Sequence, residues 1–198
     1  MHREKFHEVI EQAATELEEI ETVREIAIKS AREIIRTSRK IIHEVHLEKD
    51  VSEDFKKLKE AMMNVRTLCE KIDKNKILPV LEDAYQEYAE AYLFLAIVRE
   101  EDIPSHRELG ITPTAYLLAL GDLIGELRRY CLNNLKIGNF EKGNQILEIM
   151  EEIYREIELL DFPAAIAPVR HKVDIARAIM DKTRSDVVYA KIMKKNHS

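Results

Sequence analysis

The sequence predicts an all-α protein: an elongated bundle of six or seven helices that forms a single domain over residues 1–198. Apolar residues recur every three or four positions through long stretches of the chain, which is the helical period. Only 5 Gly and 5 Pro occur, too few for the many turns of an all-β sandwich. The chain is 45% apolar and 34% charged, a composition that folds. No repeat of fixed period and no Ser- or Gly-rich linker divides it.

The first expected helix covers residues 6–45, where the apolar pattern continues without a break. At about 1.5 Å per residue, a helix of roughly forty residues approaches twice the diameter of a small domain. We therefore expect it to reach another subunit. A second helix should follow the N-cap residue Ser52 and end near residue 74, and a third should run from residue 78 or 79 to about 101.

Three further helices complete the expected bundle. Thr112 followed by Pro113 is a helix start, because proline at the first position gives up an amide that would lack a partner. Gly138 closes this helix. The next is expected over residues 140–160, before Pro163, and the last from residue 163 or 168 to about 193.

Composition also excludes several functional classes. There are 37 Asp and Glu against 31 Lys and Arg, a net charge of −6, so any nucleic-acid contact must come from a local basic patch. Only two cysteines occur, Cys69 and Cys131, in apolar or helical contexts and without the several closely spaced Cys or His of a zinc site, so neither zinc nor a disulfide scaffold is expected. No nucleophile elbow or glycine-rich phosphate loop is present. The charged N-terminus resembles neither a signal peptide nor a membrane anchor, so a cytoplasmic location is expected.

Carboxylates interrupt the apolar pattern of two expected helices. Glu87 and Glu90 share one side of the third helix, and Asp122 and Glu126 are the only charged residues between 115 and 127. Burial of such carboxylates without a counter-ion would cost several kcal/mol. Acid pairs on two helices suit Mg²⁺, which takes oxygen ligands and could activate water on a phosphodiester.

Interpretations of these features that involve no metal or catalysis stay open. The acids could form a solvated charged face, or pair with arginines across helices. Gly121 and Gly125, each one residue before an acid, fit either close helix packing or room for metal and substrate. A di-iron bundle is set aside, because the only Glu-x-x-His match is Glu4 to His7.

A basic ridge follows one face of the first helix, with His46 one turn further on. Its members are Arg32, Arg36, Arg39, Lys40 and His43. Such a ridge could track a phosphate backbone, or it could be a solvated face whose arginines pair with acids of another helix. Arg128 and Arg129, beside Glu126, could likewise contact phosphate or neutralise the acids. Four tyrosines are expected in the core rather than as base-stacking platforms: Tyr88, Tyr92, Tyr116 and Tyr130.

The segments QEYAEAYLF (86–94) and GDLIGELRRYCLNN (121–134) resemble the translin family, and more narrowly its catalytic translin-associated factor X branch. The resemblance implies helical subunits that assemble into closed octameric barrels enclosing RNA. It also implies a Mg²⁺-dependent endoribonuclease acting on single-stranded RNA, with Mn²⁺ as a substitute. By motif, the catalytic and metal-binding acids are Glu87 and Glu90 in QEYAE, and Asp122 and Glu126 in DLIGE.

Because one chain carries all four acids, the resemblance implies a homo-oligomer. Enclosure in a barrel would favour unpaired RNA as the ligand, with single-stranded DNA as a second ligand. The residues expected to position the strand are Arg32, Arg36, Arg39, His43 and Arg129. Two alternatives remain: a non-catalytic barrel that binds single-stranded nucleic acid, in which the acids pair with arginines, and a helical scaffold for protein partners.

Overall fold

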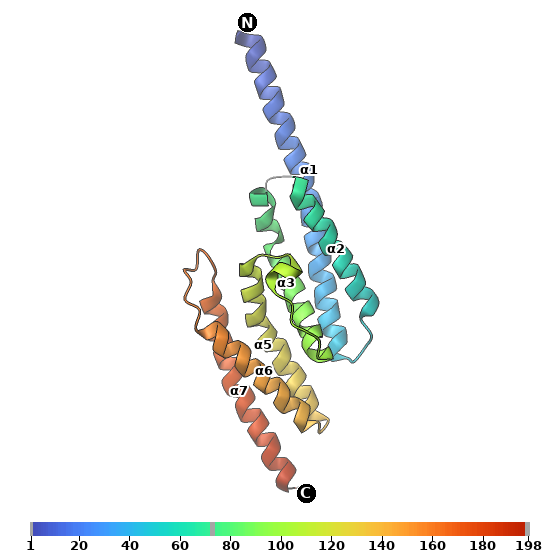
Figure 1. Ribbon diagram of the computed structural model, residues 1–198, viewed down its shortest axis with the longest axis vertical. Coiled ribbons are helices and arrows are strands. Elements are labelled where there is room, and N and C mark those ends of the chain that lie inside the picture. The colour runs from blue at the N-terminus through green and yellow to red at the C-terminus, as the bar shows by residue number, and fades with distance from the viewer. Residues whose placement is uncertain (1, 72–73, 197–198) are drawn as a thin grey trace.

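The computed structural model describes residues 2–71 and 74–196, and within them it contains seven helices and no strand (Figure 1). The all-α prediction and the number of helices are confirmed. In chain order the helices are α1 (His2–His46), α2 (Ser52–Lys71), α3 (Lys74–Arg99), α4 (His106–Leu109), α5 (Pro113–Lys136), α6 (Phe140–Glu158) and α7 (Val169–Asn196).

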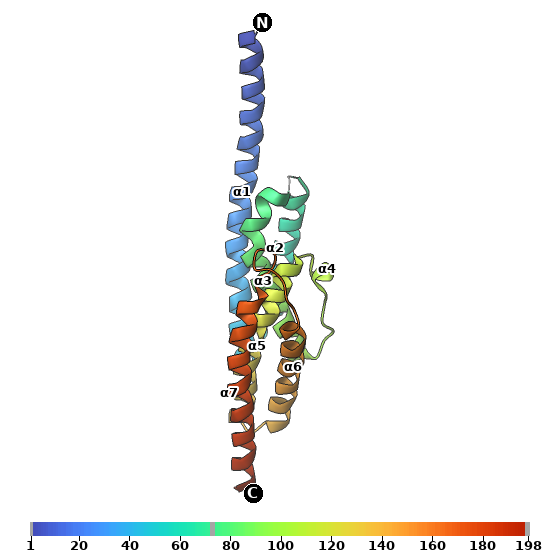
Figure 2. The ribbon, with the colours of Figure 1, turned by 90° about the vertical axis from the view of Figure 1, so that its left-hand side faces the viewer.

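The helices form an elongated bundle with the two chain ends at opposite tips (Figure 1). α3 packs between α1 and α5, and α5 in turn contacts α6 and α7. Figure 2 shows α1 and α7 along one face of the molecule and α6 on the opposite side. The central pair α3 and α5 is therefore flanked by α1 and α7, so side chains from four helices can meet there.

The hydrophobic core extends through the bundle along α3 and α5. Apolar side chains at helical spacing on these two helices are fully buried, and those of α1, α6 and α7 close around them. The largest fully buried side chains are Phe94, Ile34, Ile41, Leu58, Ile77, Leu81, Leu93, Leu123, Ile124, Leu127, Ile146 and Met150. Tyr88 is buried, and Tyr92, Tyr116 and Tyr130 pack against the core, as expected.

The N-terminal half of α1 projects beyond the rest of the molecule (Figures 1 and 2). Its apolar stripe continues the buried one, yet Phe6, Ile10 and Leu17 are exposed, and full burial begins only at Ala27. The expectation that this helix outgrows the bundle is confirmed. Among the described residues, no helix is long and apolar enough to span a membrane.

The boundaries of α5 follow the expected local signals. The Thr112 hydroxyl accepts a hydrogen bond from the Ala115 amide, Pro113 is the first helical residue, and Gly138 follows the helix with φ of 83°. A short helix, α4, lies between the third expected helix and the one that starts at Pro113, where no helix was predicted. It is fixed by a capping box, because the Ser105 hydroxyl accepts from the Glu108 amide while the Glu108 carboxylate accepts from the Ser105 amide.

One expected helix cap and one expected helix start are wrong, while α2 begins at Ser52, within one residue of the expected start. Ser52 is not the capping acceptor of α2; its own amide and hydroxyl donate to Asp50 Oδ1, at 2.9 and 2.6 Å. Aspartate thus takes the role predicted for serine, two residues earlier in the chain. α3 starts at Lys74 and not at residue 78 or 79, so Pro79 lies inside it.

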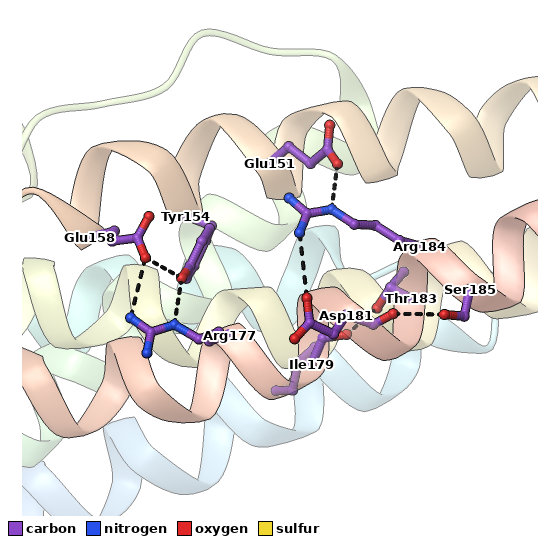
Figure 3. Close-up of polar contacts among 9 residues, drawn as sticks. All are labelled: Glu151, Tyr154, Glu158, Arg177, Ile179, Asp181, Thr183, Arg184 and Ser185. Carbon is purple, nitrogen blue, oxygen red and sulfur yellow. Dashed lines mark hydrogen bonds and ion pairs between the residues drawn. The ribbon is translucent and has the colours of Figure 1, made fainter.

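Polar contacts fix α7 against α6 (Figure 3). Arg177 donates to the Tyr154 hydroxyl and to Glu158, at 3.0 and 3.2 Å. One turn of α6 earlier, Arg184 donates to Glu151 at 2.8 Å. These pairs are largely exposed and add little stability, but they set the position of α7 along the bundle.

Candidate functional site

The four acids predicted to form a site lie on the two central helices. α3 carries Glu87 and Glu90, and α5 carries Asp122 and Glu126. The negative charges of the other three each act on the Glu90 carboxyl, so the structure brings all four into one electrostatic cluster. α1 and α7 border the cluster and supply its partners.

Glu90 is the buried member of the cluster, with 9% of its surface exposed. Burial, followed by repulsion from Asp122, Glu87 and Glu126, raises the pKa of the Glu90 carboxyl to about 8. The nearby positive charge of Lys172 opposes this rise only in part. Glu90 therefore keeps its proton at neutral pH when no further cation is present.

Asp122 is held by a lysine from the last helix. Lys172 Nζ donates to both carboxylate oxygens of Asp122, at 2.6 and 2.8 Å, and Gln86 Nε2 donates to the same carboxylate. A Cβ atom at Gly121 would lie 2.6 Å from Lys172 Cβ, so α7 approaches this closely only because residue 121 has no side chain. Close packing therefore explains Gly121. A Cβ atom built at Gly125 would have only Ile179 Cδ1 near it, at 4.0 Å.

Glu87 is held from the opposite side by α1. Arg39 Nε donates to the two Glu87 oxygens at 3.0 and 3.1 Å, and Nη2 also donates to Oε1. These bonds raise the pKa of the Arg39 guanidinium. The arginine side chain remains 68% exposed, so it lies at the solvent-exposed edge of the cluster. For Arg39, the alternative that ridge arginines pair with acids of another helix is confirmed.

Glu126 is bound by a buried histidine. His46 Nε2 lies 2.6 Å from Glu126 Oε2, and this hydrogen bond is the main reason that the pKa of Glu126 is lowered. The His46 ring is 1% exposed, packs 4.8 Å from the Phe94 ring, and leaves Nδ1 buried without a partner. A hydrogen on Nε2 fits best, because a hydrogen on Nδ1 would be an unpaired buried donor. His46 therefore belongs to the acid cluster and not to an exposed ridge.

The other predicted strand-positioning residues are exposed near this site. Arg32, Arg36 and His43 lie on the solvent side of α1, and the charge of exposed Arg129 on α5 acts on Glu126. Two basic residues have structural roles instead. Lys40 pairs with Asp54 of α2, and Arg128 binds Thr183 and Asp186 of α7; the Arg128 bonds are both 2.8 Å.

The cluster has the chemistry of a site for a hard divalent cation. Four carboxylates provide oxygen ligands, and the buried Glu90 carboxyl is destabilised as an anion until a cation compensates it. In the described part of the chain, however, no three His, Cys, Asp or Glu side chains are already arranged to hold a metal ion. Three of the carboxylates face Arg39, Lys172 and His46. The donors fit Mg²⁺, and these partners occupy them.

Sequence reasoning found the acids but missed Lys172, Gln86 and the role of His46. Lys172 lies 50 residues after Asp122, on a helix whose position depends on tertiary packing. Its only signal in the sequence is Gly121, which makes room for it.

Comparisons with known proteins agree with this architecture. The crystal structure of AfC3PO matches with a TM-score of 0.85 and 34% identity, covering 93% of this chain and 97% of that one. A complex of AfC3PO with duplex RNA matches at 0.74 and 31%, covering 94% and 98%. Apo-NeC3PO, at 22% identity and a TM-score of 0.80, shares the fold over 91% of this chain and 96% of that one.

The sequence relationship points the same way. A protein of Methanocaldococcus jannaschii, described as uncharacterised, is 32% identical over 169 residues, which cover 85% of this chain and 76% of the relative. Residues 18–195 match the translin family, a range that holds the four acids and all their partners. The chain therefore belongs to the translin family.

Proposed function

We propose that this protein is a cytoplasmic, Mg²⁺-dependent endoribonuclease of the translin-associated factor X type, active as a homo-oligomeric barrel, with an octamer expected. The observation that carries the proposal is the acid cluster with its buried member, Glu90. A protein that only holds RNA gains nothing from four carboxylates gathered beside its basic ridge, because they repel phosphate. A cation-dependent cleavage site requires them.

The residues that would hold Mg²⁺ are Glu87, Glu90, Asp122 and Glu126, and the bound ion would activate water and stabilise charge on the phosphodiester. The chain's own groups do the rest. His46 holds Glu126 through its 2.6 Å bond, and Glu90, whose pKa is raised to about 8, would release its proton to solvent when a cation binds. We propose that the strand is positioned by exposed basic residues: Arg32, Arg36, Arg39, His43 and Arg129.

The proposed substrate is RNA, with single-stranded RNA expected from the motifs and single-stranded DNA as a further ligand. The complex of the relative AfC3PO with duplex RNA makes duplexes a second class to assay. Strands of both kinds should therefore be offered, since enclosure in a barrel would discriminate between them by width.

The decisive experiment incubates purified protein with end-labelled RNA, in Mg²⁺ or in EDTA, beside the double variant Glu87→Gln, Asp122→Asn. We expect cleavage in Mg²⁺ alone and a loss of about 100-fold or more in the variant, because charge stabilisation at the reacting phosphate is removed. RNA binding and folding should be retained. Intact RNA in every lane, but shifted in a binding gel, would instead favour the non-catalytic barrel. No binding at any salt concentration would favour the protein scaffold.

Replacement of ridge arginines should change how RNA binding depends on salt. For the pair Arg32→Gln, Arg36→Gln, the slope of log K against log salt should fall by about 1.4, because each lost phosphate contact removes about 0.7 for a single strand. Fluorescence anisotropy at several salt concentrations measures it. The control Arg155→Gln removes an exposed charge on α6, on the opposite side of the molecule (Figure 2), and should leave the slope unchanged. Equal slopes in all three proteins would remove Arg32 and Arg36 from the RNA-binding surface.

Self-association is supported by the projecting half of α1, whose apolar stripe the bundle leaves uncovered. The triple variant Phe6→Gln, Ile10→Gln, Leu17→Gln should dissociate the oligomer in sedimentation velocity. The control Met63→Gln changes an equally exposed apolar side chain on α2 and should leave it intact. An unchanged oligomer in the triple variant would place the contact elsewhere.

A further inference from the structure

Among the described residues, Lys172 is a basic side chain that lies within the acid cluster rather than at its rim. Its side chain is 24% exposed, against 68% for Arg39, and its ammonium bridges both oxygens of Asp122. His46, on the other side of the cluster, contacts Glu126 through Nε2 and leaves Nδ1 buried without a partner. The cluster therefore contains an internal lysine that serves as counter-ion to its acids.

We propose that Lys172 is a positioning residue that competes with the divalent cation: it holds Asp122 while the site is empty of metal and must leave that carboxylate when the cation binds. The inference rests on the proposed metal site and adds that Lys172 sets the affinity of this site for the cation. An ammonium on both Asp122 oxygens, with Gln86 donating as well, leaves little room for direct metal coordination. A divalent cation on the same carboxylate would also repel the ammonium strongly in this partly buried place.

The packing around Lys172 allows the side chain to move but not its helix. Gly121 lets the lysine backbone approach α5, and Arg177 and Arg184 fix α7 to α6 (Figure 3). Displacement must therefore come from rotation of the flexible four-carbon stem. The positive charge also acts on Glu90, so the same lysine moderates repulsion throughout the cluster while no metal is present.

Mn²⁺ binding tests the proposal without reference to cleavage. The free Mn²⁺ signal in electron paramagnetic resonance would be titrated with the full-length wild type, K172M, K172R and K142M. Lys142 is a matched control, because it also forms a short ion pair with a glutamate, Glu100, and its side chain is 18% exposed. We expect K172M to bind Mn²⁺ about tenfold more tightly, the equivalent of one partly buried ion pair. K172R and K142M should stay within about twofold of the wild type.

The outcomes separate this inference from the proposed function. If the wild type binds Mn²⁺ and K172M binds it equally or more weakly, Lys172 is a structural support for Asp122 and the competition is overturned. If neither the wild type nor K172M binds Mn²⁺, the metal-dependent function fails, and the inference fails with it. Circular dichroism melting verifies folding. K172Q, which retains a hydrogen-bond donor, replaces K172M in the same titration if that variant is unfolded, with the same expected tightening.

Discussion

Replacement of Glu90 by glutamine is expected to stabilise the metal-free protein at high pH, by about 5 kcal/mol at pH 9 relative to the same comparison at pH 4. The pKa of Glu90 is about 8 in the folded chain, against about 4.3 in the unfolded chain. Between these two values the folded state binds the extra proton. Stability of the wild type therefore falls as pH rises through this window, and it levels off above the folded pKa. Glutamine is neutral at every pH, like the protonated carboxyl, so the variant does not lose this stability as pH rises.

The measurement is urea unfolding in EDTA between pH 4 and 9 at one chain concentration, with the variant and wild type compared at each pH. Other titrating groups affect both proteins alike, so the difference between the two curves reports on Glu90. The control Glu19→Gln changes an exposed carboxylate of α1 and should give a flat difference. A flat difference for Glu90→Gln as well would mean that this carboxyl is ionised in the folded protein. Mg²⁺ should restore wild-type stability at high pH, because it compensates the ionised carboxylate.

The sequence predicted a helix end correctly where several signals within one segment agree, and failed where a single residue was used as the signal. α5 has a hydroxyl cap, a first-turn proline and a terminal glycine, all within its own segment, and it begins as expected. Pro79 suggested a start for α3 that the structure does not use, since the helix begins five residues earlier. Ser52 was assigned a capping role on residue type alone, while Asp50, a better acceptor, lies two residues away.

In the candidate site, a residue could be predicted when its signal lies within one helix and not when its role depends on another helix. The acids were predictable because each breaks an apolar stripe, and a broken stripe is visible within a single helix. His46 was placed on the basic ridge by its angle along α1, but its burial depends on Phe94 and Tyr130, which reach it from α3 and α5. Lys172 comes from a helix whose placement the sequence did not specify. Helical periodicity fixes the face of a residue but not which element covers that face.

Gly121 and Gly125 should respond oppositely to alanine, although they lie one turn apart on α5. Alanine improves helix propensity by about 1 kcal/mol at either position. At Gly121 the new Cβ would meet Lys172 Cβ at 2.6 Å, and that atom cannot swing away because it is fixed to the α7 backbone. The helices must separate, at a net cost of about 1–3 kcal/mol. At Gly125 the nearest atom, Ile179 Cδ1, is 4.0 Å away, so the propensity gain remains.

Thermal and urea unfolding of the two variants should therefore differ by about 2–4 kcal/mol, with the wild type between them. Separation of α5 and α7 should also pull Lys172 from Asp122, so Gly121→Ala should bind Mn²⁺ differently from the wild type while Gly125→Ala does not. Equal stabilisation by both alanines would show that α7 is free to shift in solution. In that case the 2.6 Å ion pair would be one arrangement among several, and the lysine would not hold the acid. Whether one added methyl group at residue 121 stabilises or destabilises the protein thus tests whether the fold itself places Lys172 in the site.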